Sequence, residues 1–115
     1  MLQFESQPLD KAFHALADPG RRAMIERLSI GPASVSELAK PLPMTLSAVV
    51  QHLKVLEEAG LVKSDKVGRV RTCTLEVAAM AQAERWITER KRFWVQQYDQ
   101  LEAYLAQASS HGEPE

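Results

Sequence analysis

The segment TLSAVVQHLKVLEEAGLV, residues 45–62, carries both a start signal and a stop signal for a single helix. Thr45 can cap the free N–H groups of the first turn. Gly60 can adopt the left-handed backbone conformation that closes a helix, with Leu61 folding back on Leu56. We therefore expect a short helix that is sharply defined at both ends.

The helix predicted over 45–59 has two different faces. Its apolar stripe consists of Leu46, Val49, Val50, Leu53 and Leu56, at the spacing of a helix that packs on a core. The opposite face is small or amide-bearing, and its residues are Ser47, Ala48, Gln51 and His52. Such a face is either a plain solvated surface or one that approaches a ligand closely.

Three helices are expected before this one. The first spans 9–17, and Asp18 caps the second, which has a proline at its first position. Ser34 and Glu37 form a capping box at the start of a short third helix over 34–42. The third and fourth helices, joined by a tight proline-marked turn, have the arrangement of a helix-turn-helix.

The residues after Gly60 change from helical to strand periodicity. Residues 61–75 are rich in β-branched side chains around a central Gly68 and predict two short strands joined by a tight turn. Against one Asp they carry four basic side chains, a net charge of +3: Lys63, Lys66, Arg69 and Arg71. Residues 78–107, without Gly or Pro, predict one long helix, followed by a frayed tail at 109–115.

Composition indicates one domain over 1–115. Hydrophobic residues make up 45% of the chain and charged residues 25%, as in ordinary globular proteins. No apolar run approaches the roughly 20 residues of a membrane span, and the N-terminus has no secretory pattern. Cys73 is the single cysteine, so no internal disulfide is possible and the expected compartment is the cytoplasm.

The order of elements predicts a mainly α fold with a small β-hairpin, a winged helix-turn-helix that binds double-stranded DNA. The capped helix would enter the major groove, and the hairpin would act as a wing on flanking phosphates or the minor groove. Gln51 offers the donor and acceptor that match adenine, and Ala48 suits the thymine methyl group. The predicted DNA-binding residues are Thr45, Ser47, Ala48, Gln51, His52, Lys54, Lys63, Lys66, Arg69 and Arg71, with Arg21 and Arg22 as further candidates.

Plainer interpretations of the same residues remain open. Thr45 is a cap before it is a phosphate contact, and a histidine such as His52 is more often a packing or hydrogen-bonding residue than a base contact. The wing cations would also keep an edge hairpin from aggregating.

The long helix carries aromatic and leucine side chains at near-heptad spacing. A domain of this size has little core left for them, so we expect a homodimer built from the first and last helices. The predicted interface residues are Phe13, Leu16, Trp86, Phe93, Trp94, Tyr98, Leu101 and Leu105. The alternative is packing within the chain. A twofold dimer implies a near-palindromic operator.

Four stretches resemble the ArsR/SmtB family of winged-helix repressors: LADPGRRAMIERL, SVSELA, LSAVVQHLKVLEEAGLV and VGRVRTCTLE. The resemblance covers roughly 9–105 and is most specific over 51–62. It implies that 45–59 is the recognition helix, that 61–75 is the wing, and that the terminal helices form a homodimer. It also implies an effector that lowers DNA affinity and relieves repression. Val50 stands where many members carry Ser.

The metal sites of that family are not matched. Ser34 and Ser36 occupy the positions of the thiolate ligands, and serine is a poor ligand for soft metals. The other familiar site needs Asp, His and Glu on the last helix, and residues 78–107 contain no His. Redox members pair two cysteines, whereas Cys73 has no partner thiol. The resemblance therefore implies a member with no metal or cofactor and an effector of unknown chemistry.

Two other functions remain as alternatives to a DNA-binding repressor. One is a protein–protein interaction module on the same scaffold, and the other is a metal-responsive repressor with an unrecognised site. An enzyme is disfavoured, because His14, His52 and His111 are scattered and no nucleophile has a base beside it in the pattern.

Overall fold

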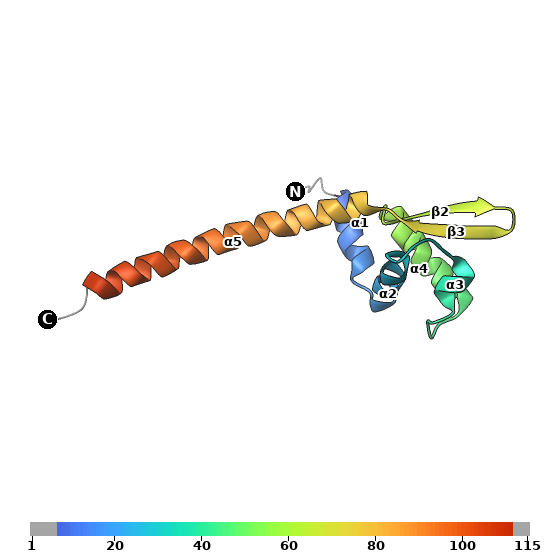
Figure 1. Ribbon diagram of the computed structural model, residues 1–115, viewed down its shortest axis with the longest axis horizontal. Helices are drawn as coiled ribbons and strands as arrows, with labels where there is room; N and C mark the ends of the chain where they lie inside the picture. The colour runs from blue at the N-terminus through green and yellow to red at the C-terminus, as the bar shows by residue number, and fades with distance from the viewer. Residues whose placement is uncertain (1–6, 112–115) are drawn as a thin grey trace, which may run out of the picture. The chain divides into compact units, whose positions relative to one another are not determined.

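The computed structural model describes residues 7–111. Figure 1 shows the elements in chain order. They are α1 (Gln7–Leu16), α2 (Pro19–Leu28), β1 (Ala33–Ser34), α3 (Val35–Ala39), α4 (Leu46–Glu58), β2 (Val62–Val67), β3 (Val70–Leu75) and α5 (Val77–His111). The predicted helix-turn-helix is therefore α3 and α4, and the predicted wing is the hairpin of β2 and β3.

The three N-caps predicted from the sequence are confirmed. The Asp18 carboxylate accepts a hydrogen bond from the Arg21 backbone N–H, which also holds the pKa of Asp18 below its usual value. Ser34 and Glu37 form the full capping box. At the start of α4, Thr45 Oγ1 accepts a hydrogen bond from the Ala48 N–H at 3.1 Å.

The sheet has three antiparallel strands in the order β1-β3-β2, one more than predicted. Ala33 pairs with Cys73, which ties the start of α3 to the wing. The hairpin closes at the Val67–Val70 pair through a two-residue turn, in which Gly68 has a φ of +65°. A positive φ at the first central residue is the pattern of a type II′ turn, which suits the twist of a hairpin.

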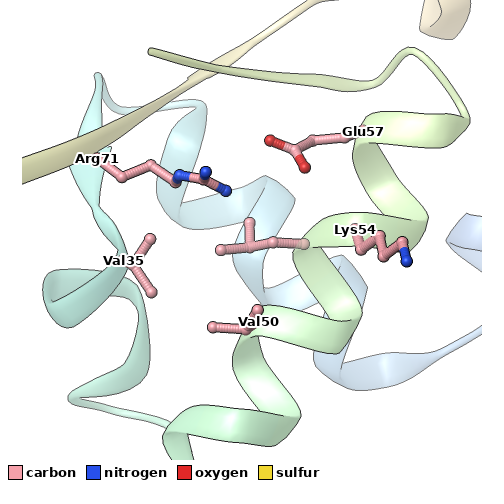
Figure 2. Close-up of a pocket in the computed structure, with 6 residues that line it drawn as sticks. Val35, Val50, Lys54, Glu57 and Arg71 are labelled. Carbon is pink, nitrogen blue, oxygen red and sulfur yellow. The ribbon is translucent and has the colours of Figure 1, made fainter. Parts of the chain in front are cut away.

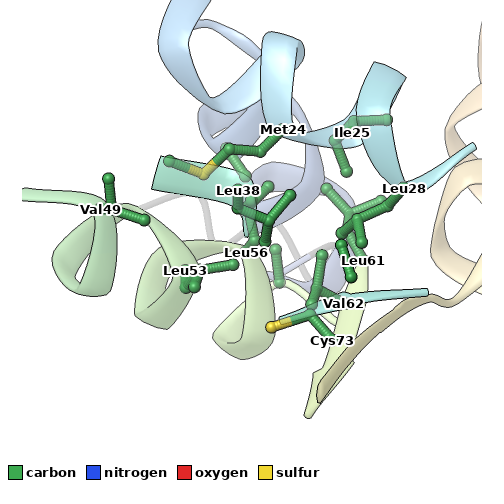
Figure 3. Packing of buried hydrophobic residues seen from close by; sticks show 13 residues of the cluster. Met24, Ile25, Leu28, Leu38, Val49, Leu53, Leu56, Leu61, Val62 and Cys73 are labelled. Atoms are coloured by element: carbon green, nitrogen blue, oxygen red, sulfur yellow. The ribbon is translucent and has the colours of Figure 1, made fainter. Parts of the chain in front are cut away.

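One apolar cluster holds these elements together (Figure 3). Every helix from α1 to α4 and every strand contributes at least one buried side chain to it. The large side chains that are completely or almost completely buried are Met24, Leu38, Val49, Leu56, Leu61 and Cys73. Burial of a side chain such as Leu56 stabilises the fold by roughly 1.5–3 kcal/mol, so α4 is anchored chiefly by its inner stripe.

The apolar stripe predicted on α4 is wider than the buried stripe in the structure. Leu46 and Val50, expected in the buried stripe of α4, are 57% and 47% exposed. The core meets only a narrow side of α4, centred on Val49, Leu53 and Leu56, so the edge positions are left in solvent.

The last helix continues to His111, beyond the predicted end at 107. Residues 112–115 of the expected frayed tail lie outside the described residues.

The chain comprises two compact units, residues up to Ala83 and residues from Glu84. The first unit contains α1 to α4, the sheet and the first turns of α5. The second is the remainder of α5. Within residues 7–111, no helix is both long and apolar enough to cross a membrane.

The closing turn of α4 leads to a stability prediction. Gly60 has a φ of +75°, and a Cβ there would meet only Ala79 Cβ, at 3.8 Å. The cost of Gly60→Ala is therefore conformational, and we expect the free energy of unfolding to fall by about 1–2 kcal/mol in urea titrations. Gly31→Ala is the matched control, because a Cβ at Gly31 meets nothing within 4 Å. Equal losses in the two variants would contradict the explanation.

Candidate nucleic-acid interface

The surface of α4 away from the core divides into two faces. Ser47, Gln51 and Lys54, spaced four and three residues apart, are exposed and share one side of the helix. Ala48 and His52 are half-buried on the adjacent side. The structure therefore separates residues that the sequence grouped together, and it leaves the first set free to meet a ligand.

His52 is engaged within its own chain. Its Nδ1 lies 3.1 Å from the Arg21 guanidinium. Because arginine only donates hydrogen bonds, Nδ1 is the acceptor and the ring proton is on Nε2. Nε2 lies 3.9 Å from the Asp18 carboxylate, and the side chain is only 23% exposed. These contacts fasten α4 to the start of α2.

The arginines at the start of α2 are similarly occupied. Arg21 donates from Nε to the Ala15 carbonyl at 2.7 Å and from its second terminal nitrogen to the His14 carbonyl at 3.1 Å. Arg22 donates to the Leu16 carbonyl at 2.8 Å. Both side chains satisfy the free carbonyls at the end of α1, which is a structural role distinct from the phosphate contact suggested by the sequence.

The wing presents all four of its predicted cations to solvent: Lys63, Lys66, Arg69 and Arg71. Lys66 and Arg71 are directly opposite each other in the β2–β3 register, so they lie on the same face of the hairpin. Like charges in that position destabilise a hairpin unless an anion lies between them. Arg69 occupies the turn itself. The hairpin therefore carries a net positive charge, and an anion bound between Lys66 and Arg71 would relieve their mutual repulsion.

Cys73, the cross-strand partner of Ser64, lies on the same face of the hairpin as Arg71. This side chain is fully buried, and burial raises the pKa of its thiol, with the nearby Glu57 carboxylate adding to the rise. Glu57 in turn accepts a hydrogen bond from the Ser64 hydroxyl. A buried, protonated thiol is a weak nucleophile, so Cys73 acts here as a packing residue.

The positions compared with thiolate metal ligands have other roles. The Ser34 hydroxyl accepts the hydrogen bond from the Glu37 N–H at 3.1 Å, and Ser36 is exposed on α3. Within the described part of the chain, no group of three or more His, Cys, Asp or Glu side chains is arranged to hold a metal ion.

The second unit exposes an unusual amount of apolar surface. The residues in question are Trp86, Ile87, Phe93, Trp94, Val95, Tyr98, Leu101, Tyr104 and Leu105, each at least 43% exposed. Trp94, Tyr98, Leu101 and Leu105 follow one another at intervals of four, three and four residues. That is the spacing of a coiled-coil seam, and contiguous exposed apolar patches mark interaction sites. In the first unit, Phe13 is half-buried, and Leu16 packs on the core cluster.

Fold and surface together define a winged helix-turn-helix DNA-binding protein, and comparisons with known proteins agree. Residues 16–65 match a family described as "Helix-turn-helix domain". The HTH-type transcriptional regulator Rv2034 of Mycobacterium tuberculosis is 46% identical over 85 residues, which cover 74% of this chain and 77% of that protein. A crystal structure of an ArsR family transcriptional regulator shares 46% identity and superposes with a TM-score of 0.74, covering 82% of this chain and 96% of its own.

The chain belongs to the ArsR family of winged-helix transcriptional regulators. The resemblance found in the sequence is thus confirmed, and the protein is a DNA-binding regulator and not an enzyme. The fold also matches a solution structure from Mycobacterium bovis, described as a homodimeric winged helix-turn-helix DNA-binding domain. That match has 20% identity and a TM-score of 0.61, and it covers 79% of this chain and 91% of that one.

The two faces of α4 predict opposite effects for neighbouring residues. His52→Ala removes the acceptor for Arg21, so we expect the free energy of unfolding to fall by about 0.5–1.5 kcal/mol. Gln51→Ala, on the exposed face, should leave stability within about 0.5 kcal/mol of the parent. Urea unfolding of the two variants measures the difference. If Gln51→Ala is the more destabilising of the two, the division of the helix surface is wrong.

Proposed function

We propose that the protein is a homodimeric repressor that places α4 in the major groove and the β2–β3 hairpin on the flanking backbone. The observation that carries this proposal is the pairing of two surfaces. An exposed, low-charge helix face lies on the same folded body as a hairpin whose cations are opposed to one another. Base readout and backbone attraction are then supplied by separate elements.

On α4, Gln51 is the proposed base reader. Its amide N–H can donate to adenine N7 while its amide oxygen accepts from the exocyclic N6 amino group, and its exposure leaves both amide atoms available. Ser47 lies beside it on the first turn, where backbone N–H groups favour a phosphate. Ala48 was expected to meet a thymine methyl group. The exposed Val50 is better placed for such an apolar contact, and we propose it for that role.

His52 is proposed as a positioning residue. Its contacts with Arg21 and Asp18 set how α4 lies on α2, and therefore how Gln51 is presented to DNA. Thr45 contributes in the same indirect way through its cap, with any phosphate contact secondary.

The wing is proposed to supply most of the affinity. Lys66 and Arg71, held opposite each other, would share a phosphate between them, which removes their mutual repulsion. Arg69 at the turn would reach farthest along the DNA, into the minor groove or onto the next phosphate. Lys63 and Lys54 extend the positive surface.

The exposed seam of α5 supports a homodimer. Trp94, Tyr98, Leu101 and Leu105 have the spacing at which two helices bury each other's side chains, and α1 would complete the interface through Phe13. A twofold dimer presents two copies of α4, so the proposed operator is near-palindromic. A dimer seated on a promoter blocks access to it. The signal that releases it is proposed to be something other than a metal ion, given the roles of Ser34 and Ser36.

The wing assignment is tested with charge-matched variants. For Arg69→Ala/Arg71→Ala, we expect affinity for the protein's own upstream DNA to fall about tenfold, or ~1.4 kcal/mol. The slope of log K against log salt should become shallower by about 1.8, or ~0.9 per lost phosphate contact. Arg85→Ala/Arg92→Ala removes the same charge from α5 at positions away from the seam of Trp94 and Tyr98, and it should change neither quantity. If both pairs weaken binding equally, net charge and not the wing governs affinity.

The dimer is tested on the second unit. A central interface tryptophan typically contributes at least 2 kcal/mol, so Trp94→Ala should weaken self-association by about 2 kcal/mol in sedimentation equilibrium. Gln96→Ala, two residues away, is the polar control and should leave the association constant unchanged. Affinity for a two-half-site DNA should fall together with dimerisation. A parent protein that is monomeric and binds no upstream DNA would instead favour the interaction-module alternative.

A further inference from the structure

A pocket lies between helices α3 and α4 and strand β3, within the first unit (Figure 2). Its volume is about 480 Å³, within the ~300–1,000 Å³ of small-molecule sites. Helix α3, helix α4 and strand β3 supply its walls through Val35, Val50, Leu53, Lys54, Glu57 and Arg71. Two of these elements, α4 and β3, belong to the parts of the fold that the proposed function assigns to DNA, so a molecule bound in the pocket would touch both.

The pocket combines an apolar wall with two opposite charges. Val35, Val50 and Leu53 form the apolar part. In Figure 2 the Arg71 guanidinium and the Glu57 carboxylate point toward one another, whereas the Lys54 ammonium points away. Among residues 7–111, the Arg71 side chain makes no hydrogen bond and no ion pair within 4.0 Å, and the Glu57 carboxylate accepts one hydrogen bond, from the Ser64 hydroxyl. The two charges therefore face each other across a gap that neither closes.

The chemistry of the walls selects one class of ligand. A simple anion would meet Arg71 but be repelled by Glu57, and a simple cation would have the reverse difficulty. A neutral apolar molecule would strip water from both charges without replacing it. A zwitterion with an apolar body matches the apolar wall and both charges. The ligand's carboxylate can pair with the Arg71 guanidinium, and the ligand's ammonium can pair with the Glu57 carboxylate.

We propose that this pocket binds an apolar zwitterion of dipeptide size, which is the effector of the repressor. The pocket volume of about 480 Å³ accommodates a molecule of that size. The two charged termini of an extended dipeptide lie roughly 6–7 Å apart, so they can reach two side chains that no ion pair within 4.0 Å joins. The regulatory part of the inference rests on the proposed function. Arg71 held by the ligand's carboxylate is withdrawn from phosphate, and Val50 is covered.

Because coupling between two ligands is reciprocal, bound DNA must lower the protein's affinity for the peptide by the same factor by which bound peptide lowers its affinity for DNA. For the loss of one phosphate contact and one apolar contact, we expect about a fivefold change, at the low end of typical coupling. The salt dependence of DNA binding should also become shallower by about 0.9 when the pocket is filled.

The site is tested without DNA, by titration calorimetry on the full chain. The probe is leucyl-leucine, compared with N-acetyl-leucyl-leucine, which lacks the ammonium, and leucyl-leucine amide, which lacks the carboxylate. We expect leucyl-leucine to bind and each blocked form to bind at least tenfold more weakly. Equal affinity for all three, or no heat from leucyl-leucine at millimolar concentration, overturns the proposal.

Two pocket variants and one control locate the binding. Arg71→Gln and Glu57→Gln should each reduce leucyl-leucine affinity at least tenfold while the thermal transition remains cooperative. Arg69→Gln changes a wing cation that does not line the pocket, so it should weaken DNA binding and leave peptide binding intact. Peptide binding that survives in both pocket variants would overturn the assignment of the site.

Electrophoretic shifts of the upstream DNA then separate the two proposals. Weaker DNA binding in the presence of leucyl-leucine supports the effector role. Peptide binding that leaves DNA affinity unchanged overturns that role. A protein that binds the peptide but no DNA contradicts the proposed function and leaves the ligand site standing.

Discussion

The burial of one narrow stripe on α4 is the constraint on which the rest of the structure depends. Val49, Leu53 and Leu56 face the core, and Leu61 folds back on them after the left-handed turn at Gly60. This packing rotates Ser47 and Gln51 into solvent. The same turn starts β2 immediately, so the wing begins where the reading helix ends. The two candidate DNA-contacting elements are thereby held by one piece of core.

The predictable parts of the fold were those encoded locally. Caps act over three residues, so Asp18, Ser34 and Thr45 could be assigned from sequence and were confirmed. Features that join distant segments could not. The two-residue strand β1 exists only because β3 pairs with it, and the Arg21–His52 contact spans 31 residues. Helical periodicity likewise located the buried face of α4 but not its width, which the neighbouring elements determine.

The candidate interface was predictable in its chemistry but only partly in its geometry. Basic residues on a hairpin are visible in the sequence, and all four are exposed. What the sequence did not reveal is that Lys66 and Arg71 are cross-strand partners, which makes anion binding relieve a repulsion as well as add an attraction. Arg21 and Arg22 are also basic, but their side chains donate hydrogen bonds to backbone carbonyls at the end of α1.

A regulator that separates base readout from backbone attraction can be controlled through either one. In the proposed function the exposed face of α4 carries little charge, so specificity would depend on Gln51 and its small neighbours, whereas affinity would depend on wing cations whose effect falls steeply with salt. Arg71 lies where these two systems meet: its guanidinium belongs to the wing and lines a pocket that Val50 of α4 also lines. Occupation of that pocket would lower affinity by withdrawing Arg71 from the DNA backbone, and it would also cover Val50, the residue proposed to meet a thymine methyl group. An effector bound between α4 and β3 would therefore act directly on the proposed DNA contacts. At the metal-ligand positions, by contrast, Ser34 is already engaged in its capping box.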